Sequence, residues 1–531
     1  MLVHCASLQV VAAELASVFH AVKHHHSYNS ADCEMKLNAV IFSDSAVAKK
    51  LMCGRTKAEA LVTNVLAPKS VELILADLSE SINGGLVPNF SISTDASNMK
   101  NRKLFPVCVQ YFSAEAGIKK KLLDFVELND EHSAEVADML VTCLRSNGLD
   151  VKNVSAYSAD NASVNYGSKK SVFTALKALN GGIINANCNA HIVHNTLRKM
   201  TDVLDCDVET IVTAVYSHFS ISANRRVELK EFFEFVDLEY HDLLRHVSTR
   251  WLSLGPAIQR LLQSWPALIS YFRSLGQECP KRIAKSLGLS NTDANDEDDG
   301  DIKLNVAKAG LLFVYNLCTL FENTVLALEC ESVTVCELYP IMQKLRGNLS
   351  DCVADRFFGY EATAILQSED IPRDVRQTAE SNFCAALERA LSYLEQWFDF
   401  SESNTACALQ ALSLKNMPTF QQIKTVAEVL KLTSVLNMDE LYDEFSTHKD
   451  GLQHVVRGND GAAVAVKWTH FFQSCGSEIP PNLFHLIAFV MSVPGSNAFP
   501  ERIFSLMNSK WTCDRNRMSV ALVKAELQVL C

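Results

Sequence analysis

The chain has 531 residues, of which 48% are hydrophobic and 21% charged, and its formal net charge is −12. A chain of this length is too long to be a single small module. Its composition is that of a folded globular protein and excludes fibrous and disordered proteins. Because the bulk charge repels a phosphate backbone, a nucleic-acid function would need local basic patches or metal ions.

The N-terminal region, residues 1–88, is predicted to be helical. Its apolar residues, such as Leu15 and Val18, recur at helical spacing. Glycines at 84 and 85 and then Pro88 end this region, because these residues interrupt a helix.

From residue 89 the pattern changes to strands and helices. Apolar alternation predicts strands near residues 90–95, 105–111 and 122–128. A helix from Ser133 ends at Asn147-Gly148, a C-cap signal. Two further strands, near 151–156 and 184–188, each precede a helix. This order of three strands, helix, strand, helix, strand, helix is typical of a ribonuclease H-like fold.

The rest of the chain is predicted to be mainly helical. Residues 266–480 carry apolar residues at helical spacing and form a helical insertion, with an acidic surface loop at 291–301. Residues 481–531 then complete the core that begins at 89–265. The predicted fold class is therefore α/β: a ribonuclease H-like mixed sheet interrupted by a large all-helical insertion, with a helical N-terminal region.

Two aspartates follow strands that are neighbours in this fold. Asp95 ends the first strand and Asp160 follows the fourth. Either residue alone is more typical of a turn or a helix cap. Together they form a carboxylate pair, which repels itself unless it binds a divalent cation, and a pair of Mg²⁺ or Mn²⁺ ions can drive phosphodiester chemistry.

Five sequence blocks stand out along the chain: STDAS around Asp95, ADNAS around Asp160, CNAH from Cys188 to His191, TRW ending at Trp251, and NAFPERIFS around Glu501. The last block continues to Arg515-Asn-Arg517-Met518. These five blocks resemble those of hAT transposases and occur in the same order, and the last one with its continuation is similar to the hAT dimerisation segment.

The resemblance implies a D, D, E active site formed by Asp95, Asp160 and Glu501, which would hold two Mg²⁺ or Mn²⁺ ions and cleave and transfer DNA strands. Taken without the resemblance, Glu501 is a first-turn carboxylate that follows Pro500 and is favoured by the helix dipole.

The resemblance also implies supporting residues. Cys188, His191 and Arg250 would support the active site, and Trp251 would hold a base flipped out of the duplex. The alternative interpretation of Trp251 is a core tryptophan beside an arginine ion pair.

Basic residues near these blocks are candidates for DNA binding, although a charge run is more often a solvated face. The candidates are Lys100, Arg102 and Lys103, then Lys119 to Lys121, and Lys169 with Lys170.

No structural zinc is predicted. The 17 cysteines occur without a Cys-x-x-Cys pair, and Cys188, His191 and His194 lack a visible fourth ligand. The run from His24 to His26 would fan out by about 100° per residue on a helix and so could not converge on one ion.

Several functions remain open at this stage. The first is a DNA transposase, and the second is a domesticated, non-catalytic nuclear scaffold or regulator, favoured by the acidic balance and the lack of a visible BED finger. A ribonuclease H-like nuclease on RNA is a third, but it leaves the Arg-Trp and C-terminal blocks unexplained.

The expected partners follow from the same patterns. We expect a nuclear protein that binds DNA, without a small-molecule substrate or a membrane, since no apolar run reaches the roughly 20 residues that span a bilayer and the first residues lack a secretory-signal pattern. We also expect self-association through an apolar face of the C-terminal segment, formed by Leu522, Ala525, Leu527 and Leu530.

Overall fold

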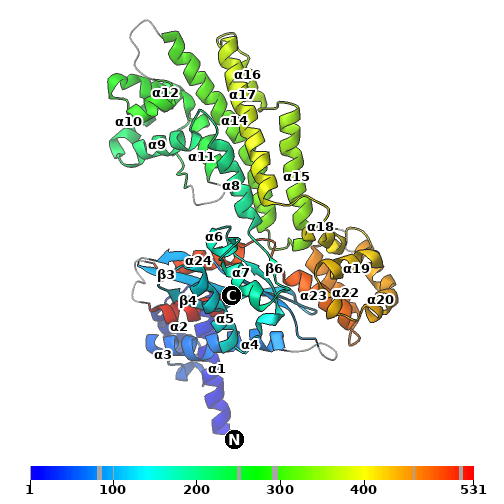
Figure 1. Cartoon of the computed structure of the whole chain (residues 1–531). Helices are drawn as coiled ribbons and strands as arrows, with labels where there is room; N and C mark the ends of the chain where they lie inside the picture. The colour runs from blue at the N-terminus through cyan, green and yellow to red at the C-terminus, as the bar shows by residue number, and fades with distance from the viewer. Residues whose placement is uncertain are drawn as a thin grey trace. The chain divides into compact units, whose positions relative to one another are not determined.

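The computed structural model describes residues 2–79, 86–99, 101–247, 253–289, 297–458, 461–512 and 518–531. The chain forms two compact units (Figure 1). The sheet unit comprises Met1–Cys188, Glu331–Glu337 and Thr405–Cys531, and the helical unit comprises Asn189–Cys330 and Leu338–Asn404. Three of the predicted site residues, Lys100, Arg250 and Trp251, lie outside the described residues.

The sheet unit contains a six-stranded mixed sheet, so the α/β class is confirmed. β3 pairs antiparallel with β1, β2 and β4, whereas β1, β5 and β6 run parallel. The central order is therefore β4-β3-β1-β5-β6. The strands are β1 (Phe90–Ser93), β2 (Ser97–Met99), β3 (Arg102–Ser113), β4 (Gly117–Leu128), β5 (Val154–Ser158) and β6 (Ile184–Asn185).

The strands differ from the predicted ones in three details. The sequence analysis missed the short β2. β5 begins at Val154 because residues 151–153 form a 3₁₀ turn. β6 ends at Asn185 and not near Cys188, although the amides of Ala186 and Cys188 still donate to carbonyls of β5 and of the residue after it.

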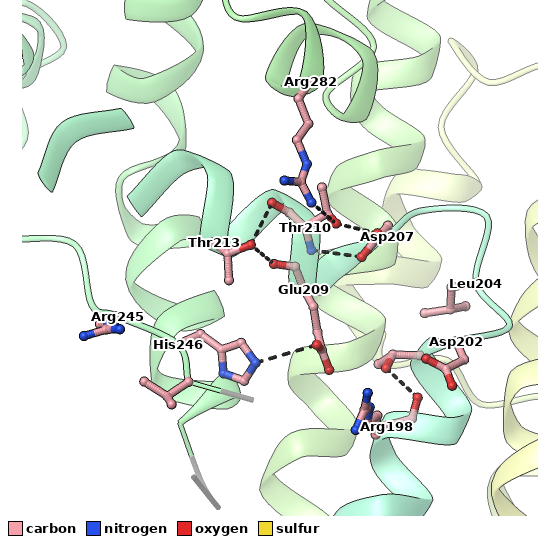
Figure 2. A pocket seen from close by; sticks show the side chains of 12 residues that line it. Arg198, Asp202, Leu204, Asp207, Glu209, Thr210, Thr213, Arg245, His246 and Arg282 are labelled. Carbon is pink, nitrogen blue, oxygen red and sulfur yellow. Dashed lines mark hydrogen bonds and ion pairs between the residues drawn. The ribbon is translucent and has the colours of Figure 1, made fainter. Parts of the chain in front are cut away.

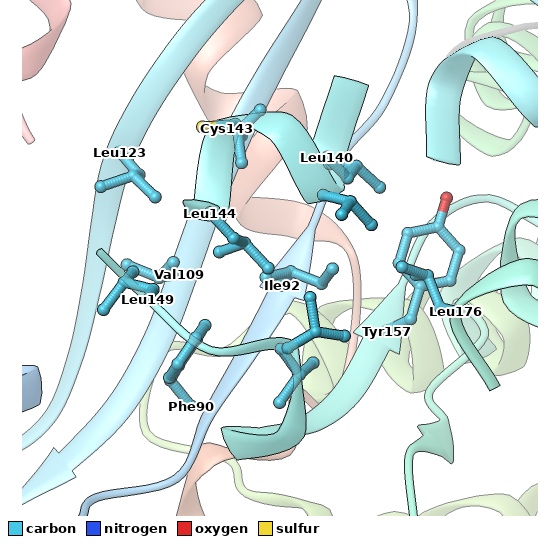
Figure 3. Packing of buried hydrophobic residues seen from close by; sticks show 14 of the residues in the cluster. Phe90, Ile92, Val109, Leu123, Leu140, Cys143, Leu144, Leu149, Tyr157 and Leu176 are labelled. Carbon is cyan, nitrogen blue, oxygen red and sulfur yellow. The ribbon is translucent and has the colours of Figure 1, made fainter. Parts of the chain in front are cut away.

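One face of the sheet is covered by α4 (Ala67–Ser79), α5 (Ser133–Ser146) and α7 (Val172–Leu179). Val109 of β3 lies there in one buried cluster with Leu140 and Leu144 of α5 (Figure 3). Val107, two residues earlier in β3, belongs to the same cluster. Leu140 and Leu144 of α5 are fully buried, as the predicted apolar face of this helix requires. Removing each such side chain from water contributes roughly 1.5–3 kcal/mol.

The opposite face of the sheet is covered by the C-terminal part of the chain. Leu104 and Cys108 of β3 pack against α24 (Ala498–Lys510) and α25 (Val520–Leu530). Further along β3, Phe112 contacts Phe472 and Phe484 of two other C-terminal helices. The sheet unit is therefore a three-layer arrangement in which β3 alternates between the two helical layers.

The N-terminal helices pack on α25. Leu522 and Ala525 lie in one buried cluster with Val18 and Met35, and Leu527 packs against the sheet. The apolar face that led us to expect self-association is thus covered within the chain. The prediction of an exposed interface on these residues was wrong, and self-association itself stays a prediction.

The remaining helices of the sheet unit lie before β1, after β5 and in the C-terminal part. They are α1 (Leu2–Lys23), α2 (Tyr28–Ile41), α3 (Arg55–Leu61), α6 (Ser163–Tyr166), α18 (Thr405–Leu409), α19 (Phe420–Val429), α20 (Met438–Thr447), α21 (Lys449–Gly458), α22 (Val464–Ser474) and α23 (Pro481–Ser492), with the 3₁₀ turns η1 (Ala48–Lys50), η3 (Val151–Asn153), η5 (Gln410–Ser413) and η6 (Leu432–Ser434) and the π-helix η2 (Val62–Leu66).

The helical unit is organised around its longest helix, α14 (Glu297–Glu329), which packs against α8, α11 and α16. Of the predicted acidic loop 291–301, residues 297–301 lie in α14, and residues 291–296 lie outside the described residues. The segment Gly300–Glu329 is long and apolar enough to cross a membrane by length and composition, contrary to our expectation, but half of its most apolar stretch is buried inside the protein.

The helical unit contains α8 (Asn189–Thr201), α9 (Val208–Ser220), α10 (Ala223–Phe235), α11 (Leu254–Gln263), α12 (Trp265–Ser274), α13 (Lys281–Ser286), α14, α16 (Tyr360–Leu366), α17 (Arg373–Trp397) and the turn η4 (Gly276–Glu278), while α15 (Val335–Ala354) begins in the sheet unit.

Candidate functional site

Asp95 and Asp160 leave the sheet at the same level. β1 and β5 are parallel neighbours, with Ser93 in register with Ser158, and each aspartate follows its strand by two residues. The amide of Thr94 donates to the carbonyl of Ser158 at 3.1 Å, which extends the pairing beyond the strands. The predicted adjacency of the two strands is confirmed.

The electrostatics of Asp95 reflect this position. The side chain is half-buried, and its Oδ1 accepts a hydrogen bond of 2.8 Å from the amide of Ala96. The pKa of Asp95 is raised to about 7, chiefly by burial and in smaller part by the nearby charge of Asp160, against the opposing effect of the Ala96 hydrogen bond. A proton or a cation is therefore favoured at Asp95 near neutral pH.

Asp160 is held by its own loop. Its Oδ1 accepts hydrogen bonds from Nδ2 of Asn165 at 2.6 Å and from the amide of Ala162 at 3.2 Å. Asn165 in turn accepts a hydrogen bond of 2.8 Å from the hydroxyl of Tyr157, which is fully buried in β5. The orientation of the Asp160 carboxylate is thus tied to the sheet.

Asn497 connects the ends of these strands to α24. It is fully buried, and its Nδ2 donates to the carbonyl of Thr94 at 3.1 Å while its Oδ1 accepts from the hydroxyl of Ser158 at 3.3 Å. Its amide also donates to Sγ of Cys188 at 3.4 Å. The sequence analysis missed Asn497, although it is the first residue of the NAFPERIFS block.

Glu501 lies in the first turn of α24, four residues after Asn497, and is half-buried. Asn497 anchors the start of α24 at the ends of β1 and β5, and Glu501 lies one helical turn beyond this residue.

The predicted supporting residues are divided between the two units. Cys188 is fully buried in the sheet unit, where its carbonyl accepts a hydrogen bond of 3.0 Å from Asn161. Cys188 thus connects the loop after β5, through Asn161, to the start of α24, through the amide of Asn497. His191 lies in α8 and belongs to the helical unit.

Three of the predicted basic residues form ion pairs with acidic side chains. Arg102 pairs with Glu127 at 3.7 Å, and Lys103 pairs with Glu131 at 2.6 Å. Lys119 pairs with Asp77 at 2.7 Å, and Lys121 donates to the carbonyl of Cys531 at 2.7 Å. By contrast, Lys169 and Lys170 are exposed in the loop between α6 and α7, which follows Asp160.

A second polar site lies within the helical unit. A cavity of about 700 Å³ is lined by Arg198 of α8, Arg282 of α13 and Arg245 (Figure 2). Acidic side chains share it, and Glu209 lies 3.9 Å from the ring of His246. The sequence analysis did not identify this cavity, because its arginines are separated by tens of residues and form no local charge run.

Comparisons with protein-family models and with curated proteins return no match to this chain.

Proposed function

We propose that the chain is a hAT-type, DNA transposase-like protein that cleaves and joins DNA strands at a site based on Asp95, Asp160 and Glu501. The observation that carries the proposal is the pair of aspartates at the ends of two parallel neighbouring strands. The element order and the central strand order β4-β3-β1-β5-β6 support the finer proposal that the fold is ribonuclease H-like.

The donor set is suited to a hard divalent cation. Carboxylate oxygens are the ligands that Mg²⁺ and Mn²⁺ prefer. A cation would also relieve the repulsion that, together with burial, raises the pKa of Asp95 to about 7. Asp95 and Asp160 would hold it, with Glu501 contributing from α24. Bound ions of this kind activate an attacking water or 3′-hydroxyl and stabilise the leaving oxygen of a phosphodiester.

The remaining residues of the site act by positioning. Asn165 and the Ala162 amide orient Asp160 through its Oδ1. Asn497 fixes the beginning of α24 at the ends of β1 and β5. It thereby determines where Glu501, in the first turn of that helix, lies relative to the two aspartates. Such supporting hydrogen bonds keep a reactive constellation rigid enough for in-line chemistry.

The second candidate function is a non-catalytic scaffold or regulator derived from such an enzyme. It is favoured by the ion pairs that occupy Arg102, Lys103 and Lys119. With a bulk charge of −12 and three of its candidate DNA-binding residues already in ion pairs, the chain is expected to bind DNA weakly.

Cleavage of plasmid DNA by the full chain distinguishes the two functions. Supercoiled and nicked plasmids are incubated with the protein in Mg²⁺ or Mn²⁺, and nicking and linearisation are followed on gels. Replacement of Asp95 or Asp160 by Asn is expected to reduce the rate by on the order of a thousandfold, because metal-borne charge stabilisation is worth several kcal/mol.

The matched control is Asp130→Asn, which changes an exposed aspartate after β4 that also accepts hydrogen bonds from the two amides following it. This variant is expected to retain full activity. DNA binding without metal-dependent cleavage by the unsubstituted chain would favour the scaffold, and equal cleavage by all three variants would attribute the activity to a contaminating nuclease.

A further inference from the structure

A cluster of histidines lies at the corner between α1 and α2, in a part of the sheet unit that the proposed function does not use. His20, His26 and Glu34 each offer one ligand atom, and these atoms lie within 4.8 Å of one another. The ring of His24 adjoins them, with its centroid 4.4 Å from that of His20 and 6.2 Å from that of His26. All four side chains are exposed.

The backbone explains how His26 comes back beside His20. α1 ends at Lys23, and His25 adopts a left-handed conformation with φ of 60°. The amide of His26 donates to the carbonyl of Ala21 at 2.8 Å, and that of His25 donates to the carbonyl of Val22 at 3.3 Å. This pair of bonds is the Schellman ending of a helix. The sequence analysis assumed that the helix continues through this run of histidines, whereas the helix ends here and the chain turns His26 back beside His20.

The third ligand comes from the next helix. Glu34 lies in α2, which begins after the cap residue Ser27, and α1 packs against α2. Beneath the cluster, Val18, Val22 and Met35 belong to one buried core. The backbone positions of the ligands are therefore set by packing before any ion binds, and only exposed side chains need to adjust.

We propose that His20, His26 and Glu34 bind a Zn²⁺ ion, with His24 or a water as the fourth ligand. Imidazole together with a carboxylate suits zinc, whereas Mg²⁺ and Ca²⁺ select oxygen ligands. Bonds of about 2.0–2.1 Å in a tetrahedral site place ligand atoms about 3.3 Å apart, so the distances between the ligand atoms must shorten by up to about 1.5 Å. The sequence analysis predicted no structural zinc, because it considered the run from His24 to His26 without His20 and Glu34.

The position of the cluster implies a structural consequence. Val22, between the histidines, accepts a hydrogen bond of 2.7 Å from Lys510 of α24. Tyr28, just beyond them, donates a hydrogen bond of 2.7 Å to Glu526 of α25. An ion that holds α1 to α2 at this corner would therefore also stabilise the packing of the N-terminal helices on the C-terminal ones.

Zinc binding to the full-length, reduced chain tests the proposal. Isothermal titration with ZnCl₂ measures affinity, and the absorption spectrum with Co²⁺ reports the ligand type. We use the Asp95→Asn/Asp160→Asn background, so that loss of the carboxylate site cannot be confused with loss of this one. One equivalent of zinc is expected, with a higher melting temperature, and a hundredfold excess of Mg²⁺ is expected not to displace it.

Substitution of the ligands separates this site from adventitious binding. His20→Ala, His26→Ala and Glu34→Gln are each expected to weaken binding at least tenfold, since even loss of a group that only supports a ligand costs roughly 10- to 100-fold. The matched control is His132→Ala, which removes an exposed histidine 3.3 Å from the carboxylate of Asp130. Unchanged affinity in the three ligand variants, or a thiolate signature in the Co²⁺ spectrum, would overturn the proposal.

Discussion

Lys510 and Glu526 form an ion pair in the interior of the sheet unit, with Nζ of the lysine 3.2 Å from Oε2 of the glutamate and each side chain 1% exposed. The pair joins α24 to α25. Lys510 also donates to the carbonyl of Val22, and Glu526 accepts from the hydroxyl of Tyr28. The pair therefore connects the two C-terminal helices to the two N-terminal ones.

Removing one member of this pair is expected to destabilise the protein strongly. Lys510→Met leaves the charge of Glu526 buried, which costs about 3–5 kcal/mol in the free energy of unfolding. Urea denaturation followed by circular dichroism measures this change.

The double variant Lys510→Met/Glu526→Leu serves as the comparison, because it removes both charges and replaces them with apolar side chains. It is expected to be less destabilised than Lys510→Met alone. A double variant as unstable as the sum of both single variants would show that the two charges do not interact.

The hydrogen bonds of Asn497 give a second prediction. Asn497→Ala removes the partners of the Thr94 carbonyl and the Ser158 hydroxyl in a fully buried place, which is expected to cost about 1–3 kcal/mol of stability. Because the start of α24 loosens, any DNA cleavage is expected to fall further than the stability loss explains.

The control for this substitution lies on the same helix. Asn508 is exposed on α24, so Asn508→Ala is expected to change stability by less than about 0.5 kcal/mol. Equal effects of the two substitutions on both stability and cleavage would remove the assigned role of Asn497.

The strands and the aspartate pair were predictable because their signals are local. Apolar alternation marks β1 and β3, and the turn after each parallel strand places Asp95 and Asp160 at the same edge of the sheet. The helices α5 and α7 followed equally from periodicity and from glycine or asparagine at their ends.

Contacts between distant segments were not predictable in this way. Asn497 lies 403 residues after Thr94, and no local pattern marks a polar side chain that bonds across such a separation. The apolar face of α25 is visible in the sequence, but its partner is not. The same pattern fits a second chain or, as found, the N-terminal helices and the sheet. The left-handed His25 was hidden because glycine or asparagine usually takes that position.

The burial of α25 leads to a third prediction. Leu527 is fully buried against the sheet, so Leu527→Asp is expected to destabilise the fold of a single chain by about 4 kcal/mol or more. Ala521→Asp, at an exposed position of the same helix, is the control and is expected to remain folded. Circular dichroism measures folding and light scattering measures the oligomeric state. If the unsubstituted chain were a folded dimer and Leu527→Asp a folded monomer, the prediction would be contradicted.

The last prediction concerns the pH dependence of stability that Asp95 imposes. Its pKa in the folded chain is about 7, raised chiefly by burial and then by Asp160, whereas an unfolded aspartate has a pKa of about 3.9. Between these values the folded state binds more protons than the unfolded state. Stability contributed by the protonated carboxyl is therefore fully present below about pH 4 and is lost as the pH rises through about 7.

This loss has an upper limit of about 4 kcal/mol, since each pKa unit corresponds to about 1.4 kcal/mol. Asp95→Asn cannot ionise, so the variant is expected to gain stability relative to the unsubstituted chain as the pH rises from 5 to 8. Urea denaturation of both proteins across this range measures the difference. A constant difference would contradict the raised pKa, and a difference that Mg²⁺ cancels at pH 8 would show that the cation replaces the proton at the aspartate pair.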